Sequence, residues 1–124
     1  MKTAISTTAA PGAIGPYSQA IDTGTFVYAS GQIPVNPATG EIPEGITAQT
    51  IQSLANVKAI LEAAGLTTDN VVKTTVFLAD MAHFGAMNEE YAKVFSQPYP
   101  ARSAVAVREL PKGVLVEIEV IALR

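Results

Sequence analysis

The chain of 124 residues contains no cysteine and a single histidine, His83. The lack of cysteine excludes disulfides, thiolate zinc sites, iron–sulfur clusters and cysteine nucleophiles. One histidine provides no imidazole cluster for a transition metal. We therefore expect chemistry that depends on neither a thiol nor a metal ion.

Charged residues and long apolar runs are also scarce. Only 15% of the residues are charged and the net charge is −3, which argues against electrostatic binding to nucleic acid. No run reaches 18 apolar residues, so no membrane span is expected. Lys2 is followed by Thr3, Ser6, Thr7 and Thr8 rather than by an apolar run, so no signal peptide is predicted and a cytoplasmic protein is the default expectation.

Apolar residues, in contrast, make up 48% of the chain. A chain of this length can bury roughly two thirds of its unfolded surface, so residues 1–124 are expected to form one domain. Glycine and proline punctuate the first third, and β-branched or aromatic segments lie between and beyond them. The expected strands are residues 20–21, 26–29, 71–79, 102–108 and 114–123.

Two amphipathic helices are predicted between these strands. The first spans residues 48–64 and is ended by Gly65. The second follows Asp80, its expected cap, and ends before Pro98. The order of strands, helix, strand, helix and two strands is that of a small α+β domain.

The predicted strands are apolar on both faces, although two helices can cover only one face of a sheet. In the last strand Val116 and Ile118 share one face, while Leu115 and Ile121 flank two glutamates on the other. An antiparallel sheet with a free face normally shows polar alternation there. We therefore expect another copy of the chain to bury the second face, in a homo-oligomer.

Arg102 is the first candidate for a functional side chain. Alternation along its strand places it on one face with Ala104 and Ala106, so the guanidinium leaves a surface of small residues. Such a guanidinium can bind a carboxylate through two parallel hydrogen bonds. The alternative is an ordinary structural ion pair.

Glu117 and Glu119 share one face of the last predicted strand. Because both side chains point the same way, they cannot flank a glycosidic bond from opposite sides. One of them can activate water as a general base, and burial beside apolar residues would raise its pKa. The alternative is that both are ion-pair partners for lysine or arginine at a subunit contact.

Four further residues have both a functional and a structural interpretation. Tyr17 follows a rigid Gly-Pro pair and is either a lid or stacking residue or a packed loop tyrosine. Asn88 lies near the apolar stripe of the second helix and either forms a specific hydrogen bond or is exposed. Ser30 and Gly31 end an early strand, where glycine either lets the backbone approach a ligand or makes a turn.

Ordered blocks of sequence at matching spacing cover nearly the whole chain. In these blocks the chain resembles the RidA (YjgF) family of 2-iminobutanoate/2-iminopropanoate deaminases. The blocks are AIGPYSQ at 13–19, SGQIP at 30–34, NVKAIL at 56–61, VKTTV at 72–76, PARS at 100–103, LPK at 110–112 and EIE at 117–119.

The resemblance implies a chorismate-mutase-like fold: a mixed six-stranded sheet with two helices on one face, assembled as a homotrimer with clefts between subunits. It also implies hydrolysis of 2-imino acids to 2-keto acids and ammonia, without a metal or cofactor. The imino acids would be released by pyridoxal-phosphate dehydratases that act on threonine or serine.

The resemblance further implies roles for individual residues. Arg102 would bind the substrate carboxylate, and Glu117 would position or activate water. The substrate-binding residues would be Tyr17, Ser30, Gly31, Phe84, Asn88 and Ala104, of which Ala104 stands where many members carry cysteine. We expect strand 71–79 to lie between the strands of Arg102 and Glu117, with these two side chains about 10 Å apart on the face away from the helices.

Two other functions could use the same cleft. Some relatives are described as endoribonucleases or translation inhibitors, and the cleft could instead bind a metabolite for regulation. The acidic charge and the lack of a basic, aromatic patch weigh against RNA binding. A trimeric, holdase-like surface without turnover is a third possibility.

Overall fold

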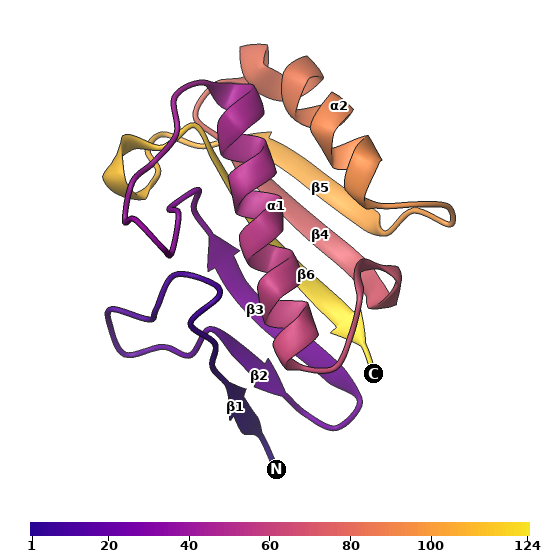
Figure 1. Cartoon of the computed structure of the whole chain (residues 1–124). Coiled ribbons are helices and arrows are strands. Elements are labelled where there is room, and N and C mark those ends of the chain that lie inside the picture. The colour runs from indigo at the N-terminus through magenta and orange to yellow at the C-terminus, as the bar shows by residue number, and fades with distance from the viewer.

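The computed structural model describes all 124 residues and consists of a six-stranded sheet with two helices against one face (Figure 1). The strand order is β1-β2-β3-β6-β4-β5, and only β4 and β5 pair in parallel. The elements are β1 Thr3–Ile5, β2 Ala20–Asp22, β3 Phe26–Gln32, α1 Ile46–Ala63, β4 Val71–Leu78, α2 Phe84–Val94, β5 Ala101–Ala106 and β6 Val116–Leu123. The predicted mixed sheet with both helices on one side is confirmed.

The hydrophobic core lies between the sheet and the helices. On β6, Val116 and Ile118 are buried toward the helices, whereas Glu117 and Glu119 alternate with them and are only half-buried. The helices contribute buried apolar side chains to the same layer, including Leu54, Val57, Leu61 and Met87. The period of two in the strand therefore identifies its core-facing side, and the wider period in the helices identifies theirs except at Ile51, which fits the apolar stripe of α1 but is 52% exposed.

The two helices differ slightly from their predicted limits: α1 begins and ends earlier, at Ile46 and Ala63, and α2 begins only at Phe84, after a short 3-10 turn that Asp80 caps. Helix α1 begins at Ile46, directly after Gly45, whose φ of 87° is in the left-handed region that glycine adopts readily. Helix α2 stops at Val94, because Phe95 is already extended, so the helix ends before Pro98 is reached. Neither helix combines the length and apolar character needed to cross a membrane.

The buried side of α1 carries polar groups that hold the irregular segment after β3. The Ser53 hydroxyl donates to the carbonyl of Gln32 at 2.7 Å. Asn56 Nδ2 donates to the carbonyls of Ile33 and Val35 at 3.1 and 3.0 Å. These bonds tie the end of β3 and the segment that follows it to α1, and they fix the chain just after position 31.

The opposite face of the sheet has no helix over it (Figure 1). Large apolar side chains remain exposed there: Tyr28 by 47%, Val105 by 45% and Leu123 by 44%. An uncovered apolar face of this kind is the feature from which the sequence predicts a homo-oligomer. The oligomer itself stays a prediction.

Candidate active site

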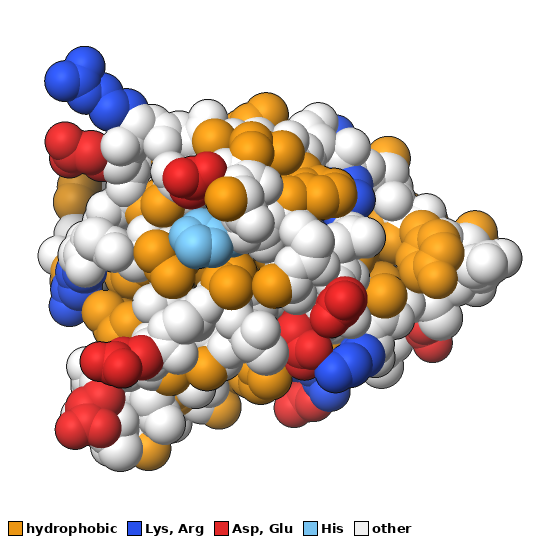
Figure 2. Space-filling view, turned by 90° about the horizontal axis from the view of Figure 1, so that it is seen from above, with side chains coloured by type: hydrophobic (Ala, Val, Ile, Leu, Met, Phe, Trp, Pro, Cys, Tyr) orange, Lys and Arg blue, Asp and Glu red, His pale blue; other side chains and the backbone are white.

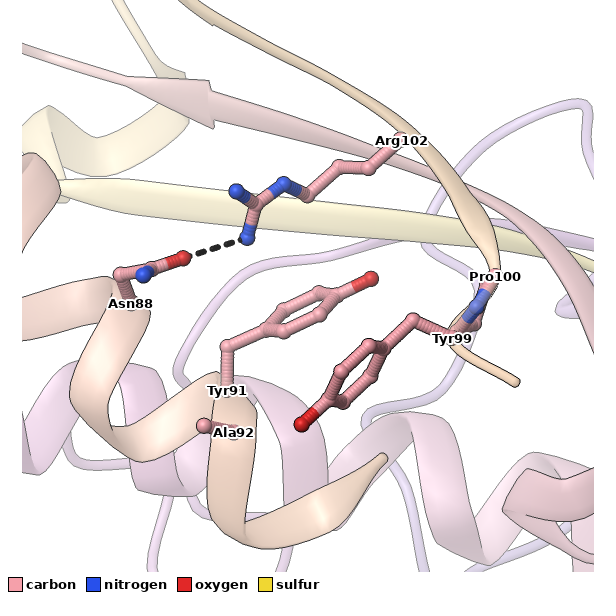
Figure 3. A pocket seen from close by; sticks show the side chains of 6 residues that line it. All are labelled: Asn88, Tyr91, Ala92, Tyr99, Pro100 and Arg102. Carbon is pink, nitrogen blue, oxygen red and sulfur yellow. Dashed lines mark hydrogen bonds between the residues drawn. The ribbon is translucent and has the colours of Figure 1, made fainter. Parts of the chain in front are cut away.

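Arg102 projects from the edge strand β5 toward α2 (Figure 3). Its Nη1 donates a hydrogen bond of 2.6 Å to Asn88 Oδ1. Its Cζ lies 4.7 Å from the centre of the Tyr91 ring and 5.3 Å from that of Phe84. Two aromatic rings and one amide, all from α2, therefore hold the cation.

Arg102 has no acidic partner within the chain. The ion pairs of the structure are Lys93–Glu90 and Arg124–Asp22, so the structural ion pair considered for Arg102 is absent from the protomer. The guanidinium instead borders a hollow of about 430 Å³. A half-buried cation beside open space attracts an anion, and the planar fork of arginine matches a carboxylate. The lining residues are Asn88, Tyr91, Ala92, Tyr99, Pro100 and Arg102 (Figure 3).

Glu117 lies against Gly31 of the neighbouring strand β3. A Cβ placed on Gly31 would overlap the carboxylate of Glu117 and would come within 2.9 Å of its Cδ. Because no side chain could occupy that space, the absence of a Cβ at position 31 lets the acid lie over β3. Within the chain, the group that closely approaches Gly31 is thus the Glu117 carboxylate.

The surroundings of Glu117 favour its neutral form. Burial raises the pKa of the Glu117 carboxyl, and the negative charge of Glu119 raises it further. Neither glutamate forms an ion pair in the protomer, so no cation offsets these two effects. A carboxyl with a raised pKa can both accept a proton from water and return it, which suits a general base.

Tyr17 and Ser30 lie on the same side of the molecule as Glu117. The ring of Tyr17 is about half exposed and borders a hollow of about 440 Å³ together with Ser30 and Glu119. Tyr17 also borders a second hollow, of about 260 Å³, that includes Gly31. The Ser30 hydroxyl donates to the carbonyl of Ser18 at 2.7 Å, so it fastens the loop that carries Tyr17.

The expected placement of Arg102 and Glu117 on one face is wrong. Strand β4 does lie between β5 and β6, but Arg102 is paired with Thr74 and Glu117 with Phe77. Residues paired across neighbouring strands share a face of the sheet, and positions 74 and 77 of one strand do not. Arg102 therefore faces the helices and Glu117 faces away from them. Alternation within a strand sorts its own residues, but it does not reveal the register between strands.

The predicted residues thus form two groups on opposite sides of the sheet. The first group lies between β5 and α2; the second surrounds β3 and the start of β6. Ala104 belongs to the first group, because it is two positions from Arg102 and packs against the core. The first group is Arg102, Phe84, Asn88 and Ala104; the second is Glu117, Tyr17, Ser30 and Gly31.

Sequence reasoning missed two aromatic residues of the Arg102 hollow. Tyr91 fits the apolar period of the second helix and Tyr99 lies outside the predicted elements, so neither is predicted to be a site residue. A signal for Tyr91 was present, because Thr74 is a polar residue in a row with Val76 and Leu78 and would need a hydrogen-bond partner if buried. Tyr99 immediately precedes the PARS block, and nothing else in the sequence marks it.

Comparisons with known proteins agree with the two-layer fold and with the sequence blocks. The family described as Endoribonuclease L-PSP matches residues 7–124. A RutC family protein of Haemophilus influenzae is 58% identical over 97% of this chain and 95% of its own length. The 2-iminobutanoate/2-iminopropanoate deaminase of Escherichia coli K12 is 53% identical over 100% and 99%. The crystal structure of E. coli TdcF with bound serine has a TM-score of 0.95 and 51% identity, and the match covers 98% of each chain.

These matches first place the chain in a class, the small proteins of the family described as Endoribonuclease L-PSP. Within that class, the chain belongs to the RidA (YjgF, RutC) family that its sequence blocks predicted.

Proposed function

We propose that the chain is a deaminase that hydrolyses 2-imino acids, such as 2-iminobutanoate and 2-iminopropanoate, to 2-keto acids and ammonia. The observation that carries this proposal is the Arg102 guanidinium, which has no acidic partner and borders an open hollow. A 2-imino acid offers the carboxylate that this cation lacks. The similarity to the E. coli 2-iminobutanoate/2-iminopropanoate deaminase supports the same reaction.

The proposed reaction needs orientation and one proton acceptor. Arg102 holds the substrate carboxylate, and Glu117 accepts a proton while the water oxygen attacks the imine carbon. That proton passes to the imine nitrogen, which gives a tetrahedral amino alcohol, and Glu117 then transfers the proton of the alcohol's hydroxyl group to the same nitrogen. The carbon–nitrogen bond breaks, ammonia leaves, and the oxygen from water becomes the carbonyl oxygen of the 2-keto acid.

We further propose that Arg102 of one subunit acts with Glu117 of the next in a chorismate-mutase-like homotrimer. Within one protomer the two groups lie on opposite faces of the sheet, so one copy cannot present both to a small substrate. Strand β5 is an edge strand, which a second copy can approach. The uncovered apolar face that contains Glu117 is the surface that such a copy would bury.

A mixing experiment tests this division of the site. Arg102→Ala and Glu117→Gln proteins are each expected to be inactive, but subunits exchanged between them should regain activity. If each site takes its arginine and its glutamate from different subunits, an equal random mixture has about one quarter of its sites intact. Absence of any recovery, with subunit exchange verified by mass spectrometry, would contradict the composite site.

A coupled assay tests the reaction. When the protein is added to a pyridoxal-phosphate threonine dehydratase, it should accelerate the appearance of 2-ketobutanoate. The dehydratase releases an imine, and the protein should hydrolyse this imine faster than water alone does. We place this activity in the cytoplasm beside such dehydratases. A purified protein that leaves the rate of keto-acid formation unchanged over a range of concentrations would overturn the proposal.

RNA cleavage is the second candidate, because the matching family is described as an endoribonuclease. Binding to RNA normally uses a cluster of basic side chains. On the face drawn in Figure 2, lysine and arginine side chains lie apart from one another, with acidic ones between them. RNA cleavage that persists in Arg102→Ala protein would favour this second candidate.

A further inference from the structure

Thr74 is an exception on the helix-facing side of β4. Its neighbours on that side, Val76 and Leu78, are apolar, and all three side chains are fully buried. A buried hydroxyl is costly unless it is hydrogen-bonded. The partner of Thr74 is the Tyr91 hydroxyl, which lies 2.7 Å from Thr74 Oγ1.

The same tyrosine also contacts Arg102. Thr74 and Arg102 are register partners on adjacent strands, so their side chains leave the sheet side by side. The Tyr91 side chain extends from α2 and contacts both residues. Its hydroxyl forms the hydrogen bond with Thr74, and the centre of its ring lies 4.7 Å from Arg102 Cζ. Tyr91 is only 5% exposed, and burial raises the pKa of its phenol, so the ring remains a neutral, fixed support.

We propose that Tyr91, anchored by Thr74, is the positioning residue that sets the direction of the Arg102 guanidinium and thereby the affinity for the substrate carboxylate. This inference rests on the proposed function, in which Arg102 binds that carboxylate. It gives the buried Thr74–Tyr91 hydrogen bond a function. If these two side chains only filled space, an apolar pair could replace them.

The need for such a support follows from the lack of an ion pair. Arginine has a long, flexible side chain, and an acidic partner usually fixes its direction. Here Asn88 engages Nη1, and the ring of Tyr91 supports the planar cation. With these two contacts the guanidinium is oriented before the substrate arrives, so less conformational entropy is lost on binding.

The test uses Tyr91→Phe, Thr74→Val and the double variant. Each single change breaks the same hydroxyl link and lets the ring move, so KM for the imino acid and Kd for 2-ketobutanoate should each rise about fivefold. The kcat should stay within about twofold, because Glu117 and the attacking water are untouched. The double variant should resemble the single variants, since both remove one interaction.

Thr50→Val is the matched control. Thr50 is also a fully buried threonine, and its hydroxyl donates to the Ile46 carbonyl at 2.8 Å within α1. This change should lower thermal stability without altering KM or Kd. If Tyr91→Phe and Thr74→Val likewise change stability alone, the pair is structural and the positioning role is refuted.

The Arg102→Ala variant distinguishes a failure of the positioning role of Tyr91 from a failure of the proposed function. Unchanged affinity for 2-ketobutanoate in Arg102→Ala protein contradicts the proposed function, and the positioning role falls with it. Lost affinity in Arg102→Ala together with normal affinity in Tyr91→Phe contradicts the positioning role alone.

Discussion

Arg102→Ala should lower kcat/KM for 2-imino acid hydrolysis by about a thousandfold and leave the chain folded. The change removes the paired, charge-assisted hydrogen bonds to the substrate carboxylate and with them the orientation of the imine carbon. The fold should survive, because Arg102 is outside the hydrophobic core and its side chain makes a single hydrogen bond, to Asn88. Keto-acid formation in the coupled dehydratase assay measures the loss, and circular dichroism checks the fold.

Two variants define what that loss means. Arg102→Lys keeps the charge but not the planar fork, so its activity should lie between those of the native protein and Arg102→Ala. Arg124→Ala removes an arginine that is paired with Asp22 on the surface and should leave activity unchanged. Near-normal rates in Arg102→Ala would remove the central assignment of the proposed mechanism.

The architecture could be predicted because it depends on local periodicity. The alternation of Val116 and Ile118 with Glu117 and Glu119 identifies the two faces of β6 without any knowledge of its neighbours. The stripe of apolar residues in α1 likewise identifies its core-facing side, apart from Ile51, which is exposed. These patterns predict the faces well because burial of apolar surface is the main driving force of folding.

For the site, individual residues could be proposed from the sequence, but their arrangement in space could not be predicted. The face on which Arg102 lies depends on its pairing with Thr74, and that pairing depends on the segment that connects α2 to β5. No sequence period encodes such a register between a strand and a parallel neighbour. The residues of the two groups therefore remain predicted site residues, while the expectation that Arg102 and Glu117 share one face of the sheet was wrong.

Long-range hydrogen bonds were invisible for the same reason. Asn56 on α1 resembles any polar helix residue, yet its amide serves carbonyls more than twenty positions away. Tyr91 resembles a core aromatic, yet its hydroxyl meets Thr74 on β4. Such partners become apparent only when each buried polar atom must be satisfied in three dimensions.

Glu117→Gln should abolish most of the activity and yet stabilise the protein at neutral pH. Glutamine has nearly the same shape but cannot accept the proton from water, so kcat should fall by about 10²-fold or more. The stability gain arises because burial and Glu119 raise the pKa of Glu117 above its ordinary value of 4.5 in the folded chain. At pH 7 the surroundings of Glu117 within its own protomer therefore disfavour its charge, and the glutamine variant is free of that cost.

The pH dependence gives this prediction a sign that can be checked. Well below pH 4.5 the carboxyl is protonated in both the folded and the unfolded chain, so the difference in Tm between the two proteins should disappear. The difference in Tm should grow as the pH rises through the raised pKa and then stay constant.

The activity of the native protein should fall as the pH drops through the same pKa, because the base must be ionised to accept a proton. Glu119→Gln, which removes the neighbouring charge, should remain active and shift this acid limb to lower pH. A Glu117→Gln protein that keeps its activity, or is less stable than the native protein at pH 7, would show that the carboxyl has another role.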